Sequence, residues 1–190
     1  MAIERALMQK LESWKANPAR RALLLDGARQ VGKTFAARAF AESHYDIFLE
    51  INFVETPGAR AIFDGDLDAE TIIMGLTAYS GTALVPGKTL VFFDEVQACP
   101  RARTAIKFLV DDGRFDYIES GSLLGVTCQH VESLPVGYEE EVRVFPLTFR
   151  EFAEAAGIQR ETIEHARQAC QDGSLVPDVI HERLLRAFRI

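Results

Sequence analysis

The chain has 190 residues, a formal net charge of −7 and 48% hydrophobic residues. This length suits one compact domain, alone or with a short appendage. The net acidity does not support a generic nucleic-acid binder, because such proteins usually carry a basic face. No apolar run approaches the roughly 20 residues that a membrane span needs, and the charged start of the chain lacks the apolar core of a secretory signal. We therefore expect a cytoplasmic protein with no membrane partner.

Helical and strand patterns alternate along the first three quarters of the chain. Spacings of three and four between apolar residues indicate helices, and short continuous apolar runs are typical of strands buried on both faces. The helix that begins at Pro100 should end before Gly113, and Asp68 is the predicted cap of the helix that follows it. The predicted strands are 22–25, 47–53, 90–93, 115–119 and 142–145, and the predicted helices in this part are 4–15, 35–41, 68–79 and 100–112.

This alternation predicts an α/β fold with a mostly parallel five-stranded sheet and helices on both of its faces. After Pro146 the pattern changes to helix only, over 149–156, 161–170 and 177–188. We therefore divide the chain into a core of residues 1–147 and a helical extension of residues 148–190.

The strongest motif follows the first predicted strand. Residues 27–34 match the P-loop pattern G-x-x-x-x-G-K-[ST] at every fixed position, and the motif opens a predicted helix, as its mechanism requires. Glycines let the loop approach a ligand closely, and the start of the helix favours phosphate. Lys33 is predicted to reach the β- and γ-phosphates, and the Thr34 hydroxyl to bind Mg²⁺. The predicted nucleotide-binding residues are Gly27, Ala28, Arg29, Gln30, Val31, Gly32, Lys33 and Thr34.

A second motif ends the most apolar predicted strand, 90–93. Asp94 and Glu95 follow it directly, at the sheet edge where ligands of parallel sheets bind. We expect Asp94 to hold Mg²⁺ together with Thr34, and Glu95 to orient and deprotonate the attacking water. The sequence thus predicts ATP and Mg²⁺ as cofactors and hydrolysis as the reaction.

Small polar residues follow the next predicted strand. In ATPases of this architecture a polar residue there contacts the γ-phosphate or the attacking water, so Ser120 or Ser122 could serve; a plain serine–glycine turn is the alternative. The guanine-reading motif N/T-K-x-D is absent from the sequence, and position 97 is Gln where GTPases place glycine. Both absences favour adenine over guanine. The three cysteines, Cys99, Cys128 and Cys170, are far apart and are predicted to be reduced thiols.

Taken together, these motifs resemble a family of prokaryotic AAA-like P-loop ATPases that usually continue into a C-terminal domain of unknown function. The resemblance implies a P-loop strand in the centre of the sheet and a helical lid, of which this chain holds the start. It also implies that the chain is the ATPase portion of a longer protein. The segments that carry the resemblance are 27–34, 90–102, 121–125, 134–137 and 145–152.

One position departs from the family pattern. Many relatives carry Arg after the glycine that matches Gly137, and this chain has Tyr138. A phosphate-sensing arginine could instead be Arg143, Arg101 or Arg103, or a neighbouring subunit could supply one.

Three functions follow from these patterns. The first is an ATPase that couples hydrolysis to a conformational switch. The second is a nucleotide-gated interaction module with little turnover, which would form a homo-oligomer or bind a protein partner through the apolar stripe of the last helix (Ile180, Leu184, Leu185 and Phe188). The third, an ATPase stimulated by nucleic acid, is not supported by the net charge.

Overall fold

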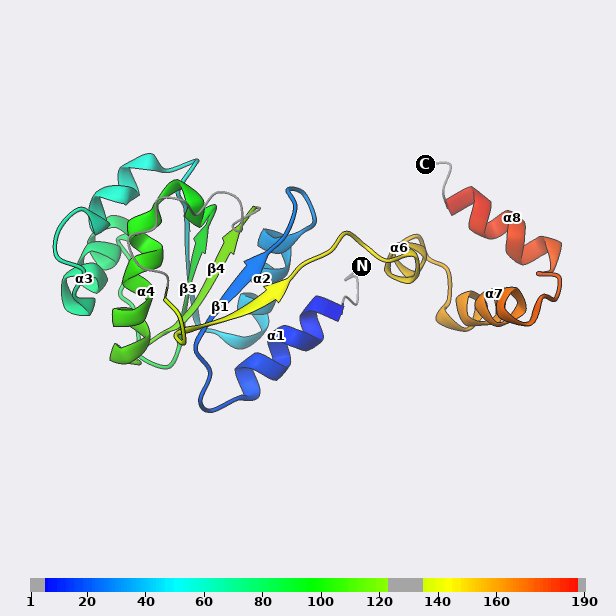
Figure 1. The fold of residues 1–190 in the computed structure, drawn as a ribbon, viewed down its shortest axis with the longest axis horizontal. Helices are drawn as coiled ribbons and strands as arrows, with labels where there is room; N and C mark the ends of the chain where they lie inside the picture. The colour runs from blue at the N-terminus through cyan, green and yellow to red at the C-terminus, as the bar shows by residue number, and fades with distance from the viewer. Residues whose placement is uncertain (1–5, 123–134, 188–190) are drawn as a thin grey trace. The chain divides into compact units, whose positions relative to one another are not determined.

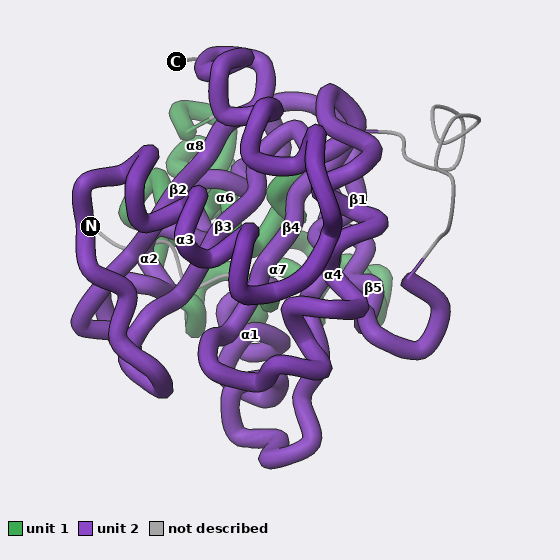
Figure 2. Tube along the Cα trace, turned by 90° about the vertical axis from the view of Figure 1, so that its left-hand side faces the viewer, with its two compact units in different colours: residues 1–6, 146–190 green, residues 7–145 purple. Residues whose placement is uncertain are grey.

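The computed structural model describes residues 6–122 and 135–187, and it divides into two compact units (Figure 2). The larger unit comprises Leu7–Phe145, and the smaller comprises Met1–Ala6 and Pro146–Ile190. The assignment of residues 1–147 and 148–190 to separate domains stays a prediction.

The larger unit contains a five-stranded sheet in the order β2-β3-β4-β1-β5 (Figure 1). Every strand pairing among the described residues is parallel. In this order the strand before the P-loop, β1, lies inside the sheet between β4 and β5, and β4 is the middle strand. The strands are β1 (Ala22–Asp26), β2 (Ile47–Asn52), β3 (Thr89–Asp94), β4 (Asp116–Gly121) and β5 (Glu139–Arg143).

The last strand differs from its prediction. The sequence placed it at 142–145, whereas β5 is Glu139–Arg143, so the prediction was three residues late at its start. As an edge strand, β5 carries consecutive glutamates that are partly or fully exposed. A prediction based on runs of apolar residues cannot detect such a strand. Pairing with β1 sets its position, with Ala22 opposite Glu139 and Asp26 opposite Arg143.

Helices cover both faces of the sheet and create two apolar cores. Figure 1 shows α3 and α4 on one face and α1 and α2 on the other. The predicted cap is confirmed, because the Asp68 carboxylate accepts a hydrogen bond from the Thr71 amide at 2.9 Å. The elements are α1 (Ala6–Ala16), α2 (Lys33–His44), α3 (Ala69–Ser80), α4 (Pro100–Asp112) and the short 3₁₀ helices η1 (Pro57–Phe63) and η2 (Val96–Ala98).

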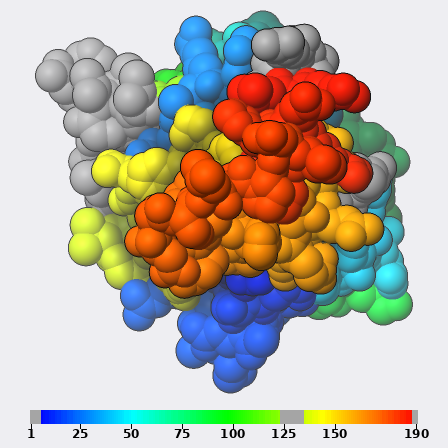
Figure 3. All heavy atoms as spheres, turned by 90° about the vertical axis from the view of Figure 1, so that its right-hand side faces the viewer, coloured from blue at the N-terminus to red at the C-terminus, as the bar shows by residue number. Residues whose placement is uncertain are grey.

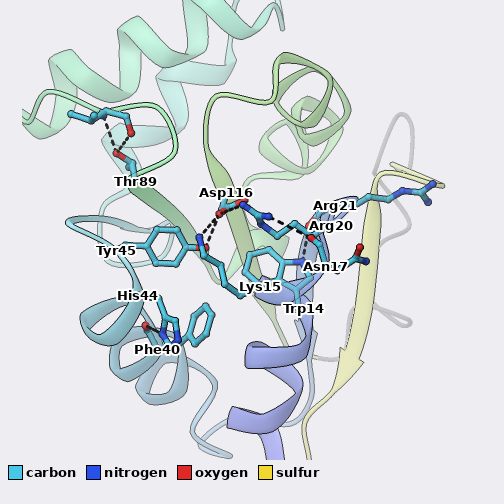
Figure 4. A network of polar contacts seen from close by, with 11 residues as sticks. Trp14, Lys15, Asn17, Arg20, Arg21, Phe40, His44, Tyr45, Thr89 and Asp116 are labelled. Carbon is cyan, nitrogen blue, oxygen red and sulfur yellow. Dashed lines mark hydrogen bonds and ion pairs between the residues drawn. The ribbon is translucent and has the colours of Figure 1, made fainter.

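A polar network ties the amino-terminal end of β4 to its neighbours (Figure 4). Asp116 accepts two hydrogen bonds from Arg20, at 2.7 and 2.9 Å, one from Lys15 at 3.0 Å and one from the Tyr45 hydroxyl at 2.8 Å. Burial disfavours ionisation of Asp116, but these donors outweigh it and lower its pKa. The network therefore holds α1 and the turn before β1 against the sheet, at the amino-terminal ends of the strands and so opposite the P-loop.

The described part of the smaller unit contains the helices α6 (Phe149–Ala155), α7 (Arg160–Asp172) and α8 (Asp178–Ala187). The surface of α7 and α8 is orange to red in Figure 3. Thr148 and Glu151 form a capping box at the start of α6. On α8, Leu184 packs against the small core of this unit, whereas Leu185 is 45% exposed. Phe188 and Cys128 lie outside the described residues. None of the described helices has the length and apolar character to cross a membrane.

Glu119 is an unusual member of the core of the larger unit. It is fully buried in β4, opposite Leu24 on β1 and Phe93 on β3. Neither of its carboxylate oxygens has a hydrogen-bond partner among the residues that the structure describes. Burial, followed by the negative charge of Glu139, raises the pKa of Glu119 well above its usual value, although the charge of Arg103 opposes this shift.

This raised pKa predicts a pH-dependent stability. The folded chain holds a proton on Glu119 that the unfolded chain loses above about pH 4.5, the usual value for glutamate. The contribution of Glu119 to stability should therefore be greatest below that pH and should fall as the pH rises toward the folded-state pKa. The Glu119→Gln variant should lose part of this fall, so its urea midpoint should change less between pH 5 and pH 8 than that of the wild type. Equal slopes for the two proteins would contradict the prediction; Glu42→Gln, at an exposed position on α2, is the control.

Candidate functional site

The P-loop connects the carboxyl end of β1 to the start of α2. Two of its residues adopt left-handed backbone conformations, Gln30 with a φ of 63° and Gly32 with a φ of 88°. Gly27 leaves no room for a side chain, since a Cβ atom there would lie 2.3 Å from the carbonyl oxygen of Val144. The side chains of Ala28, Arg29 and Gln30 are exposed, whereas Val31 packs into the core between the sheet and α2.

Lys33 lies in the first turn of α2 and is only 6% exposed. Its ammonium donates hydrogen bonds of 2.8 Å to the carbonyl oxygens of Gly27 and Ala28, and one of 3.4 Å to the Ser122 hydroxyl. Burial lowers the pKa of Lys33, and the negative charges of Glu95 and then Asp94 oppose this effect. The lysine therefore closes the loop on itself and places its charge beside the acidic residues at the end of β3.

Asp94 is the centre of the hydrogen-bonded cluster at this edge of the sheet. It is 4% exposed, and its Oδ2 atom accepts hydrogen bonds from the Thr34 hydroxyl at 3.0 Å and from the Asn52 amide at 3.2 Å. Its Oδ1 atom accepts from the Ser120 hydroxyl and from the backbone amide of Glu95. These hydrogen bonds replace the contacts with water that burial removes from the carboxylate.

Sheet geometry explains why these side chains meet. Asn52, Asp94 and Ser120 end or nearly end β2, β3 and β4, three adjacent parallel strands, so they share one edge of the sheet. Alternation along each strand directs all three toward the face that α2 covers. Because β4 lies between β3 and β1, Ser120 contacts Asp94 on one side while Ser122 contacts the P-loop lysine on the other.

Five of the sequence-predicted site residues form two hydrogen-bonded groups at this end of the sheet. Lys33 contacts Ser122, and both Thr34 and Ser120 contact Asp94. Glu95, the predicted general base, directly follows Asp94 and has a left-handed backbone with a φ of 54°. The roles of all six residues stay predictions.

Sequence reasoning missed two residues of this cluster. Asn52 donates to Asp94 and also accepts hydrogen bonds from the backbone amides of Val54 and Glu55, which fixes the turn after β2. Gln97 donates a hydrogen bond from its amide to the Glu95 carboxylate. A signal for Asn52 was present, because it is the polar residue that ends a predicted strand at the same sheet edge as Asp94.

The three candidate arginines have different surroundings. Arg101 donates to the carbonyl oxygens of Phe63 and Gly65, and Arg103 is paired with Glu139 at 2.6 Å. The Arg143 side chain is 67% exposed and lies 3.9 Å from Asp26, which ends the strand before the P-loop. Arg143 therefore has the most freedom to reach a ligand at the loop.

The donor set at this edge suits a hard cation. The Thr34 hydroxyl and the Asp94 carboxylate offer oxygen ligands within 3.0 Å of each other. No group of three or more His, Cys, Asp or Glu side chains in the described part of the chain could hold a metal on its own. A site with few protein ligands fits Mg²⁺, which usually keeps several waters and is shared with substrate phosphates.

Similar folds occur among solved structures. The chain superimposes on the Walker-type ATPase PABY2304 of Pyrococcus abyssi with a TM-score of 0.54 and 18% identity, covering 95% of this chain and 62% of that one. The Aeropyrum pernix Orc1 protein in complex with DNA has a TM-score of 0.51 and 16% identity, and the match covers 90% of this chain and 56% of that one. Drosophila ORC bound to DNA has a TM-score of 0.56 and 12% identity, and the match covers 94% of this chain and 53% of that one. The chain thus spans little more than half the length of these proteins, and at such identities the likeness concerns the fold alone.

Sequence comparison gives the family. A search of curated protein sequences finds no significant match. A family model described as "AAA domain" matches residues 19–153, which include the P-loop and all five strands. This match and the fold support a nucleotide-binding function of the ATPase type. The chain belongs to the AAA domain family.

Proposed function

We propose that the chain binds ATP with Mg²⁺ at the edge of the sheet formed by the P-loop, β3 and β4, and that it hydrolyses the γ-phosphate. The observation that carries this proposal is the buried cluster in which Thr34, Asp94 and Ser120 are joined by hydrogen bonds beside the Lys33 ammonium. A hydroxyl, a carboxylate and an ammonium in this arrangement match the triphosphate and metal chemistry of P-loop ATPases.

Each residue has a distinct task in this proposal. The loop amides and the start of α2 would bind the phosphates, and Lys33 would exchange its bonds to the loop carbonyls for bonds to phosphate oxygens. When bound, Mg²⁺ would neutralise phosphate charge through the oxygen atoms of Thr34 and Asp94. Ser120 would hold the Asp94 carboxylate in place, and Ser122 would hold the Lys33 ammonium. Glu95 would accept the proton of the attacking water. Arg143 is the candidate for sensing the γ-phosphate.

The broader role is a conformational switch within a longer protein. The lengths of the similar ATPases, of which this chain spans little more than half, support the view that it is one portion of such a protein. A second candidate function is a nucleotide-gated interaction module with little turnover. The exposed apolar residues Val179 and Leu185 on α8 favour it, since they could contact a protein partner or a second copy.

Replacing Lys33 should weaken nucleotide binding. A hydrogen bond to a charged group contributes about 1.5–3 kcal/mol, so Lys33→Ala should lower ATP affinity by about ten- to hundredfold in calorimetry. Lys10→Ala, at an exposed lysine on α1, should bind ATP like the wild type. Equal affinities for the Lys33 variant and the control would remove the P-loop from the proposed site.

Replacing Glu95 should separate binding from hydrolysis. A general base contributes about a hundredfold or more to the rate, so Glu95→Gln should lower kcat by at least about that factor while ATP affinity stays within about twofold. Phosphate release and calorimetry on the same preparation give both numbers. Tight ATP binding by a wild type that releases no phosphate would instead favour the interaction module.

Removing the Asn52 amide should alter the metal requirement. Side chains that orient a metal ligand typically affect metal affinity by about ten- to hundredfold, so Asn52→Ala should raise the Mg²⁺ concentration for half-maximal hydrolysis by about tenfold. Glu55→Gln, at the exposed end of the same turn, is the matched control. An unchanged Mg²⁺ dependence in a folded Asn52→Ala protein would show that the amide does not orient Asp94.

A further inference from the structure

The short turn after β3 contains a hydrogen bond between Gln97 and Glu95 that has no role in the proposed chemistry so far. Gln97 lies within η2 (Val96–Ala98), two residues after Glu95, and its side-chain Nε2 atom donates a hydrogen bond to Oε2 of Glu95. The predicted general base is therefore held by a side-chain amide.

The backbone of this turn is rigid. The carbonyl oxygen of Glu95 accepts a hydrogen bond from the Ala98 amide at 2.9 Å, and that of Val96 accepts one from the Cys99 amide at 3.0 Å. Val96, between Glu95 and Gln97, is fully buried in the core that α3 and α4 cover. A left-handed residue such as Glu95 is retained at a cost of about 1–3 kcal/mol where its surroundings fix it.

The second polar atom of Gln97 points to a role beyond stability. Its Oε1 atom is buried and has no hydrogen-bond partner among the described residues. An unpartnered buried acceptor costs about 1–3 kcal/mol, so an apolar side chain of the same size would stabilise the fold better. The glutamine is therefore better explained by its contact with Glu95 than by packing.

We propose that Gln97 is a positioning residue for hydrolysis. Its amide restricts the Glu95 carboxylate to one orientation, with Oε2 occupied and the other oxygen left to accept the proton of the attacking water. A general base must lie within hydrogen-bond reach of the proton that it removes, and a flexible glutamate would satisfy this condition only part of the time. The inference rests on the proposed function, because it assigns Gln97 to the same site.

The test compares four proteins in Mg²⁺-ATP hydrolysis and ATP binding: wild type, Gln97→Met, Glu95→Gln and the control Gln168→Met. Methionine keeps the size of glutamine but cannot donate a hydrogen bond. We expect Gln97→Met to lower kcat by about ten- to hundredfold, the range for a misplaced catalytic group, with KM and ATP affinity within about twofold of wild type. Gln168 forms a similar amide–carboxylate contact with Asp172 on α7, within the smaller unit, so its replacement should leave kcat unchanged.

A second readout separates a positioning role from a packing role. If the amide positions Glu95, kcat should fall in Gln97→Met while KM and the midpoint of thermal unfolding stay near those of the wild type. A packing role would instead lower the unfolding midpoint and leave the kcat of the folded protein unchanged. If Gln97→Met does not fold, as thermal unfolding would reveal, Gln97→Ala replaces it.

The outcomes separate the two proposals. A wild-type kcat in Gln97→Met, together with a large loss in Glu95→Gln, would overturn the role of Gln97 and leave the ATPase proposal intact. Absent turnover in the wild type would overturn the proposed hydrolysis and the role of Gln97 with it. An unchanged kcat in Glu95→Gln would overturn the role of Glu95 as general base, and so that of Gln97, while hydrolysis itself would stand.

Discussion

The burial of the Asp94 carboxylate is the constraint on which the rest of the site depends. At 4% exposure, an ionised carboxylate needs hydrogen bonds to replace those of water. Its donors come from α2, β2 and β4, through Thr34, Asn52 and Ser120. Each donor is within reach only if the strands keep their order and α2 covers the correct face. The same contacts that stabilise the carboxylate therefore hold the P-loop helix against the ends of the strands.

Departures from local conformational rules gather at this edge of the sheet. Among the described residues, Gln30 and Glu95 are the only non-glycine residues with a positive φ, and both belong to the candidate site. Gln97, with its unpartnered buried oxygen, is adjacent. Strained backbone and unsatisfied polar atoms are tolerated where function requires them. Other unsatisfied polar atoms in the described part of the chain lie outside the site, on Tyr117, Glu119 and Glu139. The Glu119 carboxylate lies deeper on the α4 face of the same sheet, where it affects stability more directly than chemistry.

Most elements were predictable because their local patterns and their tertiary environments agree. The fully buried strands β1 and β3 appear in the sequence as continuous apolar runs, and α4 begins at a proline and ends at a glycine with a φ of 71°. The edge strand β5 was misplaced because its glutamates conceal it: only its pairing with β1 defines where it begins. A strand that depends on its neighbour more than on its own composition has a weak local signal.

The sequence by itself determined the α/β fold class, the P-loop and the acidic pair that ends β3, since each is encoded in a contiguous segment whose residue types suffice to indicate it. Strand order is not contiguous in this way. Only the tertiary structure placed β4 between β3 and β1, and so brought Ser120 to Asp94 and Ser122 to Lys33. Asn52 and Gln97 entered the site for the same reason: hydrogen bonds between side chains depend on distances in space, which a spacing along the chain does not record.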